Sequence, residues 1–179
     1  RGSDMGVDAI EIAAINKKDD FFNCYPHEDI DTENETVYNK VFNSFAKRIG
    51  SVSMVCNRLC NSIRLNLIDN KFPIVLSGDH SSALGTISGI KAAYPEKELG
   101  VVWIDAHADL HTPYTSPSGN IHGMPLAAAL NDDNLDFQIN KLIDDTDLYW
   151  NQMKNIGIEG PKIKHESIIY FGVRDMEEP

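Results

Sequence analysis

The sequence contains few cysteines, and it lacks a long hydrophobic run. Its three cysteines are an odd number, and Cys56 and Cys60 are four residues apart in a predicted helix, so a disulfide framework is not expected. No apolar stretch approaches the roughly 20 residues that a membrane-spanning helix needs. The N-terminus also lacks the charged-then-apolar layout of a signal peptide. We therefore expect a cytoplasmic protein.

Basic residues are also scarce. Sixteen Lys and Arg stand against 27 Asp and Glu, which gives a formal net charge of −11 over 179 residues. Nucleic acids and anionic membranes attract clusters of Lys and Arg, so neither is an expected partner, whereas a small cationic substrate is compatible with this charge. The length and the 42% hydrophobic content are typical of one domain with a hydrophobic core.

Hydrophobic spacing predicts alternating helices and strands. Apolar residues recur at intervals of three or four from Val37 to Leu67, which predicts an amphipathic helix opened by the capping-box pattern Thr32-x-x-Glu35, with Gly50 as a point where it could divide. A second helix is predicted over residues 82–94. Short buried strands are predicted over residues 72–76, 99–104 and 167–173. Strands separated by helices imply a parallel sheet with helices on both faces.

Residues 131–165 differ in character from the rest of the chain. This segment is acidic and partly helical, and it is interpreted as a peripheral insertion within a single α/β domain that covers residues 1–179. The loop from Leu110 to Asn120 is rich in Thr, Ser, Pro and Gly, so it is too polar to belong to the core.

Ionisable side chains gather directly after the predicted strand 99–104. They are Asp105, His107, Asp109, His111 and His122. Alternate side chains of an extended chain share a face, so the first three would point the same way. His80 follows the strand 72–76 in the same manner, and functional groups of parallel sheets collect beyond the carboxyl ends of neighbouring strands. Imidazole and carboxylate donors without thiolate suit Mn²⁺, Co²⁺ or Zn²⁺. A polar strand end that is satisfied by turn amides is the alternative.

Three motifs resemble those of the ureohydrolase family, and within it the arginases. "SGDHSSALGTISGI" is similar to the family's G-G-D-H-S motif, "VVWIDAHADLHTP" to its D-A-H-x-D motif, and "SPSGNIHGMPLA" to the arginase substrate loop. The close match covers roughly residues 72–129. The segments "RGSDMGVDAI" and "YFGVRDMEEP" resemble the family more loosely.

The resemblance implies a three-layer α/β/α fold with a mainly parallel sheet and two Mn²⁺ or Co²⁺ ions. His80, Asp105 and Asp109 would hold one ion, and His107 with a bridging Asp105 would hold the other. A bridging hydroxide would attack the guanidinium carbon of L-arginine and yield L-ornithine and urea. His122 matches the histidine that carries protons to the leaving amine.

The resemblance also assigns the substrate contacts. Ser118 and Asn120 match positions that bind the substrate α-carboxylate, and Glu177 matches the position that receives the α-amino group. His111 stands where many arginases carry an Asn that donates to the carboxylate, and a histidine can still donate a hydrogen bond there. Members of the family form trimers or hexamers, so a homo-oligomer is expected.

The sequence departs from the family on the C-terminal side of these motifs and at its N-terminus. The later S-x-D-x-D motif, which supplies two further aspartate ligands, is absent, and so is the first strand. We therefore expect an incomplete portion of the arginase fold. Agmatinase or another ureohydrolase is the alternative function within the fold, and a catalytically silent, truncated ureohydrolase-like protein is the alternative outside enzymes.

Overall fold

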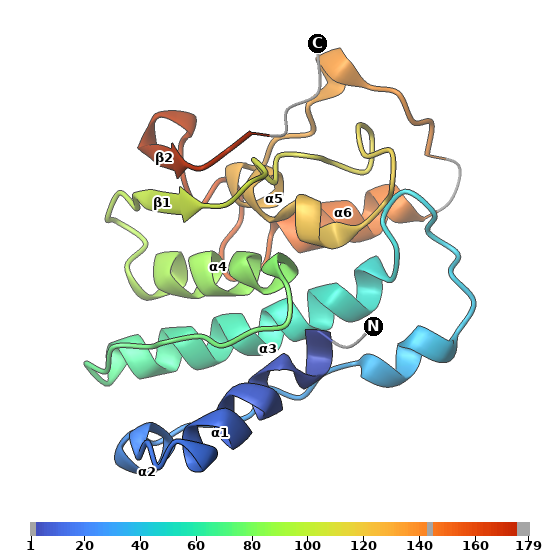
Figure 1. Cartoon of the computed structure of the whole chain (residues 1–179). Helices are drawn as coiled ribbons and strands as arrows, with labels where there is room; N and C mark the ends of the chain where they lie inside the picture. The colour runs from blue at the N-terminus through green and yellow to red at the C-terminus, as the bar shows by residue number, and fades with distance from the viewer. Residues whose placement is uncertain (1–2, 143–144, 175–179) are drawn as a thin grey trace.

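The computed structural model describes residues 3–142 and 145–174 (Figure 1). Its helices are α1 (Gly6–Asn16), α2 (Phe21–Cys24), α3 (Ile49–Ile68), α4 (Ala83–Ala93), α5 (Pro125–Leu130) and α6 (Thr146–Lys154), and its strands are β1 (Val101–Ile104) and β2 (Ile168–Phe171). Single turns of 3₁₀ helix are η1 (Ser3–Met5), η2 (Asn34–Tyr38), η3 (His80–Ser82), η4 (Ile121–Gly123), η5 (Leu135–Phe137) and η6 (His165–Ser167). No helix in these two ranges is long and apolar enough to cross a bilayer.

The sheet of the described chain consists of β1 and β2, which pair in parallel. The register runs from Val101 opposite Ile168 to Ile104 opposite Phe171. A parallel pair needs a long crossover, and here the connection contains α5 and α6. The predicted α/β class, the parallel pairing and the strands within 99–104 and 167–173 are therefore confirmed.

The strand predicted over residues 72–76 is wrong. The segment is extended but has no strand partner among the described residues, and Phe72 and Ile74 are 89% and 67% exposed. A strand exists only through ladder hydrogen bonds to a neighbour, so apolar, β-prone residues alone do not make one. Figure 1 shows this segment running back along α3 toward α4.

The long helix predicted from the capping box at Thr32 begins much later, at Ile49. Arg48 has a left-handed backbone (φ 60°), which ends helical geometry on its N-terminal side. Its guanidinium donates to the carbonyls of Thr36 and Val37, which belong to the separate turn η2. Local periodicity was therefore misleading before residue 48. Gly50 lies inside α3 and does not divide it, and the helix predicted over residues 82–94 is confirmed as α4.

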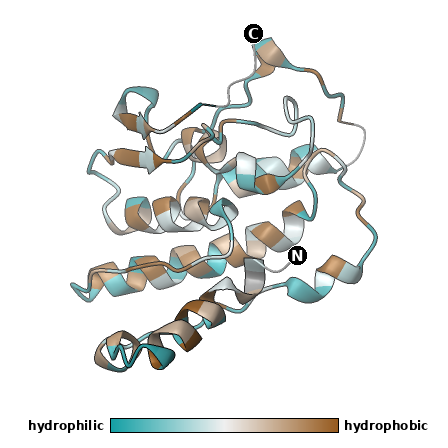
Figure 2. Ribbon diagram, viewed as in Figure 1, coloured by the Kyte–Doolittle hydropathy of each residue, from teal (hydrophilic) through white to brown (hydrophobic). Residues whose placement is uncertain are grey.

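The core forms where α3 packs on α4. A Cβ atom at Gly85 would lie 2.6 Å from the carbonyl oxygen of Cys56, and one at Gly89 would lie 2.6 Å from that of Cys60. Only glycine allows the two helices to approach this closely. Cys56 and Cys60 on the buried face of α3 belong to the same hydrophobic cluster as the small residues of α5. In Figure 2, α3 and α4 alternate between brown and teal segments, whereas α1 is largely brown although none of its residues is buried.

The acidic segment 131–165 contributes to this core. Trp150 and Met153 of α6 are completely buried in the main hydrophobic cluster. Burying a side chain as large as tryptophan contributes on the order of 2–3 kcal/mol to folding. One face of helix α6 is therefore part of the core of the domain. That the segment is an insertion stays a prediction.

Candidate metal centre

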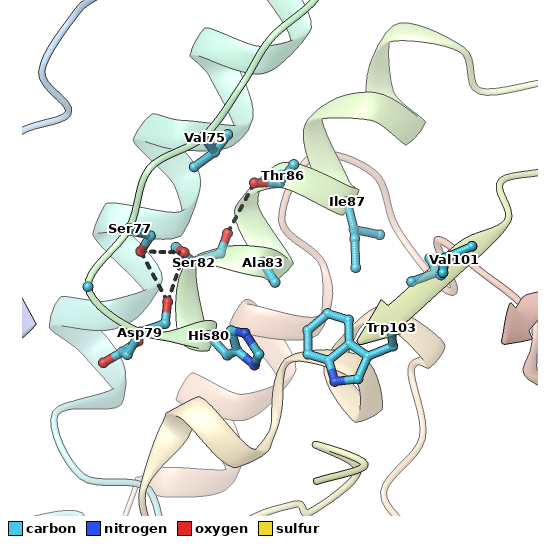
Figure 3. A pocket seen from close by; sticks show the side chains of 12 residues that line it. Val75, Ser77, Asp79, His80, Ser82, Ala83, Thr86, Ile87, Val101 and Trp103 are labelled. Atoms are coloured by element: carbon cyan, nitrogen blue, oxygen red, sulfur yellow. Dashed lines mark hydrogen bonds between the residues drawn. The ribbon is translucent and has the colours of Figure 1, made fainter. Parts of the chain in front are cut away.

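The first element of the site is the turn that carries His80. Asp79 caps η3, because its Oδ1 accepts hydrogen bonds from the backbone N–H and the hydroxyl of Ser81 at 2.9 and 2.5 Å. The Ser82 hydroxyl donates to Ser77 Oγ at 2.7 Å, as Figure 3 shows. Aspartate and serine favour such local bonds to the backbone, which is why the "SGDHSS" sequence forms a tight turn here. The turn holds His80 at the end of an otherwise unpaired segment.

The second element is the bend that follows β1. The Asp105 N–H donates to the carbonyl of Phe171 at 3.0 Å and extends the β1–β2 ladder by one residue. The chain then leaves strand geometry, and Asp109 adopts a left-handed backbone (φ 51°) that aspartate tolerates better than most residues. The expected alternation of side chains along a continued strand is therefore absent, yet Asp105 and Asp109 still converge.

His80, Asp105 and Asp109 form the centre of the cluster. The Nδ1 atom of His80 lies 2.7 Å from Oδ2 of Asp105 and 3.1 Å from Oδ2 of Asp109. One donor atom from each of the three residues lies within 4.8 Å of the other two, a spacing that one metal ion can span. His107 lies on the other side of Asp105, with its Nδ1 atom 3.5 Å from Oδ1. The two oxygens of Asp105 thus face different histidines.

The electrostatics of the two carboxylates differ. Burial raises the pKa of Asp109 above its usual value, and the negative charge of Asp105 raises it further, against a hydrogen bond from His80. Desolvation also acts to raise the pKa of Asp105, but a hydrogen bond from the His107 N–H and the charge of His80 outweigh it, so this pKa is lowered. A divalent cation would keep both groups ionised, and the mixed nitrogen and oxygen donors fit Mn²⁺, Co²⁺ or Zn²⁺.

The side chain of Trp103 packs beside His80. The sequence motifs did not indicate this residue as part of the site. The two ring centroids are 4.9 Å apart with planes at 63°, and Trp103 is 8% exposed. The signal was its place in β1 two residues before Asp105, where alternate side chains share a face. A cavity of about 530 Å³ opens between β1 and the segment that leads to His80, and Val75, His80 and Trp103 line it (Figure 3).

The turn η4 lies next to this cluster, because it contacts η3, and loop 111–120 leads directly into η4. The His111 N–H donates to the carbonyl of Gly123 at 3.0 Å, which closes the loop and brings His111 near η4. The imidazole of His111 lies 3.3 Å from Thr115 Oγ1. His122, on η4, is exposed. These contacts place η4, which carries His122, beside the turn η3 that carries His80, and the backbone of His111 beside η4.

The remaining predicted substrate residues lie at the tip of the loop. Ser118 is exposed, and its Oγ accepts a hydrogen bond from the Asn120 N–H at 3.2 Å. The side-chain oxygen of Asn120 accepts from Lys47 Nζ at 3.5 Å. An ammonium group has donors only, so this contact leaves the amide N–H groups of Asn120 to donate elsewhere. Glu177 lies outside the described residues.

Comparisons with known proteins agree with these motifs. The model of the arginase family matches residues 1–179. An arginase of Brevibacillus brevis is 37% identical over 190 aligned residues, and an arginase of Bacillus subtilis (strain 168) is 36% identical over 180; each alignment covers 99% of this chain and 54% of the relative. The chain therefore spans about half the length of the curated relatives it matches.

Solved structures show the same relation in the fold. A crystal structure of arginase from Bacillus subtilis superposes on this chain with a TM-score of 0.69 and is 36% identical in sequence. The superposition covers 99% of this chain and 52% of the arginase chain. The native arginase structure from Bacillus caldovelox gives a TM-score of 0.63 at 34% identity, over 85% of this chain and 43% of that one. These neighbours share the α/β arrangement of this chain.

Proposed function

This chain belongs to the arginase family, and from that premise we propose that the protein hydrolyses L-arginine to L-ornithine and urea with two divalent metal ions. The observation that carries the proposal is the convergence of His80, Asp105 and Asp109 from two separate segments, with ligand atoms within 4.8 Å of one another. Carboxylates are rarely buried together without a compensating cation. The proposed reaction is inferred from the relatives, which are arginases.

The proposed metal ligands follow the family resemblance, and the distances within the cluster support them. His80, Asp105 and Asp109 would hold one ion, and His107 with Asp105 would hold the other, since the two oxygens of Asp105 lie near different histidines. When bound, the pair of ions would lower the pKa of a shared water and supply a hydroxide nucleophile at neutral pH. Mn²⁺ and Co²⁺ both accept this set of nitrogen and oxygen donors.

The proposed substrate contacts come from loop 111–120 and from Glu177, and the proposed proton transfer comes from His122. Ser118, Asn120 and His111 bind the α-carboxylate through hydroxyl, amide and imidazole donors, and Glu177 receives the α-amino group. The formal charge of −11 favours the approach of a cationic guanidinium group. His122 is exposed on η4 and transfers a proton to the leaving amine, a task that an imidazole can perform because it both accepts and donates a proton.

Urea release from L-arginine and from agmatine tests this proposal. The chain is incubated with Mn²⁺ or Co²⁺, and a matched sample contains EDTA. We expect urea from L-arginine in the presence of metal and none with EDTA. Urea from agmatine alone would overturn the assignment of the substrate, because agmatine lacks the carboxylate that loop 111–120 is proposed to bind.

A catalytically silent ureohydrolase-like protein is the second candidate. It is favoured by the contacts within the cluster, because His80 Nδ1 lies 2.7 Å from Asp105 Oδ2 and 3.1 Å from Asp109 Oδ2, so these groups can satisfy one another without an ion. Metal analysis separates the two candidates, because two tightly bound ions per chain favour the enzyme and at most one loosely held ion favours the silent protein. A single domain, a cytoplasmic location and a homo-oligomeric state are retained as proposals with the enzyme.

A further inference from the structure

Residues of the acidic segment 131–165, which follows α5, form hydrogen bonds to loop 111–120. The N–H groups of Ile139 and Asn140 both donate to the carbonyl of Tyr114, at 3.0 and 2.9 Å. The side-chain Nδ2 of Asn140 donates to the carbonyls of Pro113 and Ser116, at 3.0 and 2.7 Å. Two adjacent residues of the acidic segment thus satisfy three carbonyl acceptors of the loop.

These hydrogen bonds fix the shape of the loop because they are buried away from water. Asn140 is 9% exposed and Ser116 is 1% exposed, so water cannot replace the bonds between them. A buried carbonyl without a donor costs about 1–3 kcal/mol, and a loop normally avoids that cost by staying at the surface. The amide of Asn140 supplies two N–H donors in a fixed plane, so it sets the distance between Pro113 and Ser116.

The held turn leads directly to the proposed substrate contacts. The Ser116 hydroxyl accepts a hydrogen bond from the Gly119 N–H at 2.9 Å, between Ser118 and Asn120. The carbonyl of Gly119 in turn accepts from the Lys47 N–H at 2.7 Å. A shift at Ser116 is therefore passed to Ser118 and Asn120 through one hydrogen bond and two peptide units.

We propose that Asn140 is a positioning residue for substrate recognition, because it fixes the Pro113–Ser116 turn and thereby aims Ser118 and Asn120 at the substrate α-carboxylate. This proposal rests on the function proposed above. It also gives the acidic segment 131–165 a specific task, as the scaffold of the substrate loop. Two further bonds support that task, since Thr112 Oγ1 donates to the carbonyl of Asp133 at 2.9 Å and the Tyr114 hydroxyl donates to the Asp147 carboxylate.

Asn140→Asp is the substitution that tests the proposal. It keeps the shape of the side chain but replaces the NH₂ donor with an oxygen that faces two carbonyl acceptors. Binding is measured by isothermal titration calorimetry on the Mn²⁺-loaded chain, with L-ornithine and with putrescine, which differ only in the carboxylate. We expect the dissociation constant for L-ornithine to rise about tenfold, while those for putrescine and for Mn²⁺ itself stay within about twofold.

Asn155→Asp is the matched control. Asn155 lies in the same acidic segment, is exposed, and donates from Nδ2 to the carbonyl of Asn151 at 2.8 Å, away from the loop. The same chemical change there is expected to leave binding of all three ligands unaltered. If Asn140→Asp does not fold, Asn140→Ala removes the donors without adding charge and carries the same expectation.

The outcomes separate this inference from the proposed function. Wild-type protein that binds L-ornithine no better than putrescine contradicts the proposed substrate, whatever Asn140 does. Wild-type preference for L-ornithine that persists unchanged in the Asn140 variants overturns the positioning role. Equal loss of L-ornithine, putrescine and Mn²⁺ binding overturns it as well, because it indicates a general structural defect.

Discussion

The metal cluster and loop 111–120 satisfy their polar groups in opposite ways. The side chains of His80 and His107 are 49% and 60% exposed, and the cluster's polar contacts are mostly among its own ionisable groups. In the loop, Thr112 and Ser116 are buried, and besides bonds within the loop, Asn140 from the following segment and Lys47 from the preceding one donate to its carbonyls. The first region thus presents ionisable side chains near the surface, whereas the second has a fixed, buried shape. Substitutions in the first should change binding more than stability, and substitutions in the second should change both.

Asp109→Asn gives the largest expected effect. Asp109 is the most buried of the predicted ligands, and loss of its charge should weaken Mn²⁺ binding at least about 100-fold, since even partners outside the ligand shell affect metal affinity 10–100-fold. Stability without metal should not fall, because the change removes a carboxylate that Asp105 repels. Calorimetric titration with Mn²⁺ and chemical denaturation measure the two quantities.

Asp136→Asn serves as the control for charge, because Asp136 is exposed on η5. It should leave Mn²⁺ affinity unchanged. Wild-type affinity in Asp109→Asn would show that the cluster is a set of turn-satisfying polar groups and not a metal site.

Gly119→Ala tests loop 111–120, and its main expected effect is on stability. Gly119 has φ +69°, and an added Cβ would lie 2.0 Å from the carbonyl oxygen of Ser44. We expect the free energy of unfolding to fall by about 3 kcal/mol, from left-handed strain and overpacking together. Gly160→Ala is the control, because Gly160 has φ +77° but no atom within 4 Å of the added Cβ. Equal losses in the two variants, measured by denaturation, would mean that the loop is not tightly held against Ser44.

The proximity of Asp105 to Asp109 and the turn at His80 were predictable because short motifs specify them. The contact of His80 with the two aspartates, in contrast, was expected from the family resemblance and from a strand over residues 72–76 that the structure does not form. Asp105 and Asp109 lie within five residues, and the turn around His80 is formed by bonds between close neighbours such as Asp79 and Ser81. Local chemistry of this kind can be derived from residue types and spacing. The parallel pairing of β1 with β2 was predictable for a similar reason, since helices separate the two apolar runs.

Features that depend on distant contacts were not predictable. Asn140 bonds to Pro113 across 27 residues, and nothing in its neighbourhood distinguishes it from other asparagines of the acidic segment. The prediction of where α3 begins was wrong for the same reason. The backbone geometry at Arg48 is fixed by its hydrogen bonds to η2 and by the bond from the Lys47 N–H to the Gly119 carbonyl. The extended segment before His80 needs a neighbouring strand that its own residues cannot supply.

Cys56→Ala should have an intermediate effect that connects the core to the cluster. The Cys56 thiol donates to the carbonyl of Ser81 at 3.3 Å, directly after His80, and burial raises its pKa to about 12, so it stays protonated as a donor. Loss of this bond should weaken Mn²⁺ binding about threefold, as expected for about 0.7 kcal/mol of lost positioning. Cys60→Ala, which removes an equally buried thiol one turn away, should not change Mn²⁺ affinity. Equal effects of the two variants on titration would indicate general loosening of α3 instead.

Trp103→Phe should have the smallest effect. Its ring packs against His80, but its Nε1–H is buried without a hydrogen-bond partner among the described residues. Phenylalanine keeps an aromatic face against the imidazole and removes that unsatisfied donor, so the loss of buried area is largely offset. We expect the free energy of unfolding to change by less than about 1 kcal/mol and Mn²⁺ affinity by less than about twofold. Trp103→Ala, which removes the ring, should lose about 3–5 kcal/mol by denaturation. A Phe variant as unstable as the Ala variant would contradict this expectation, because it would show that an aromatic face alone does not replace the buried indole ring.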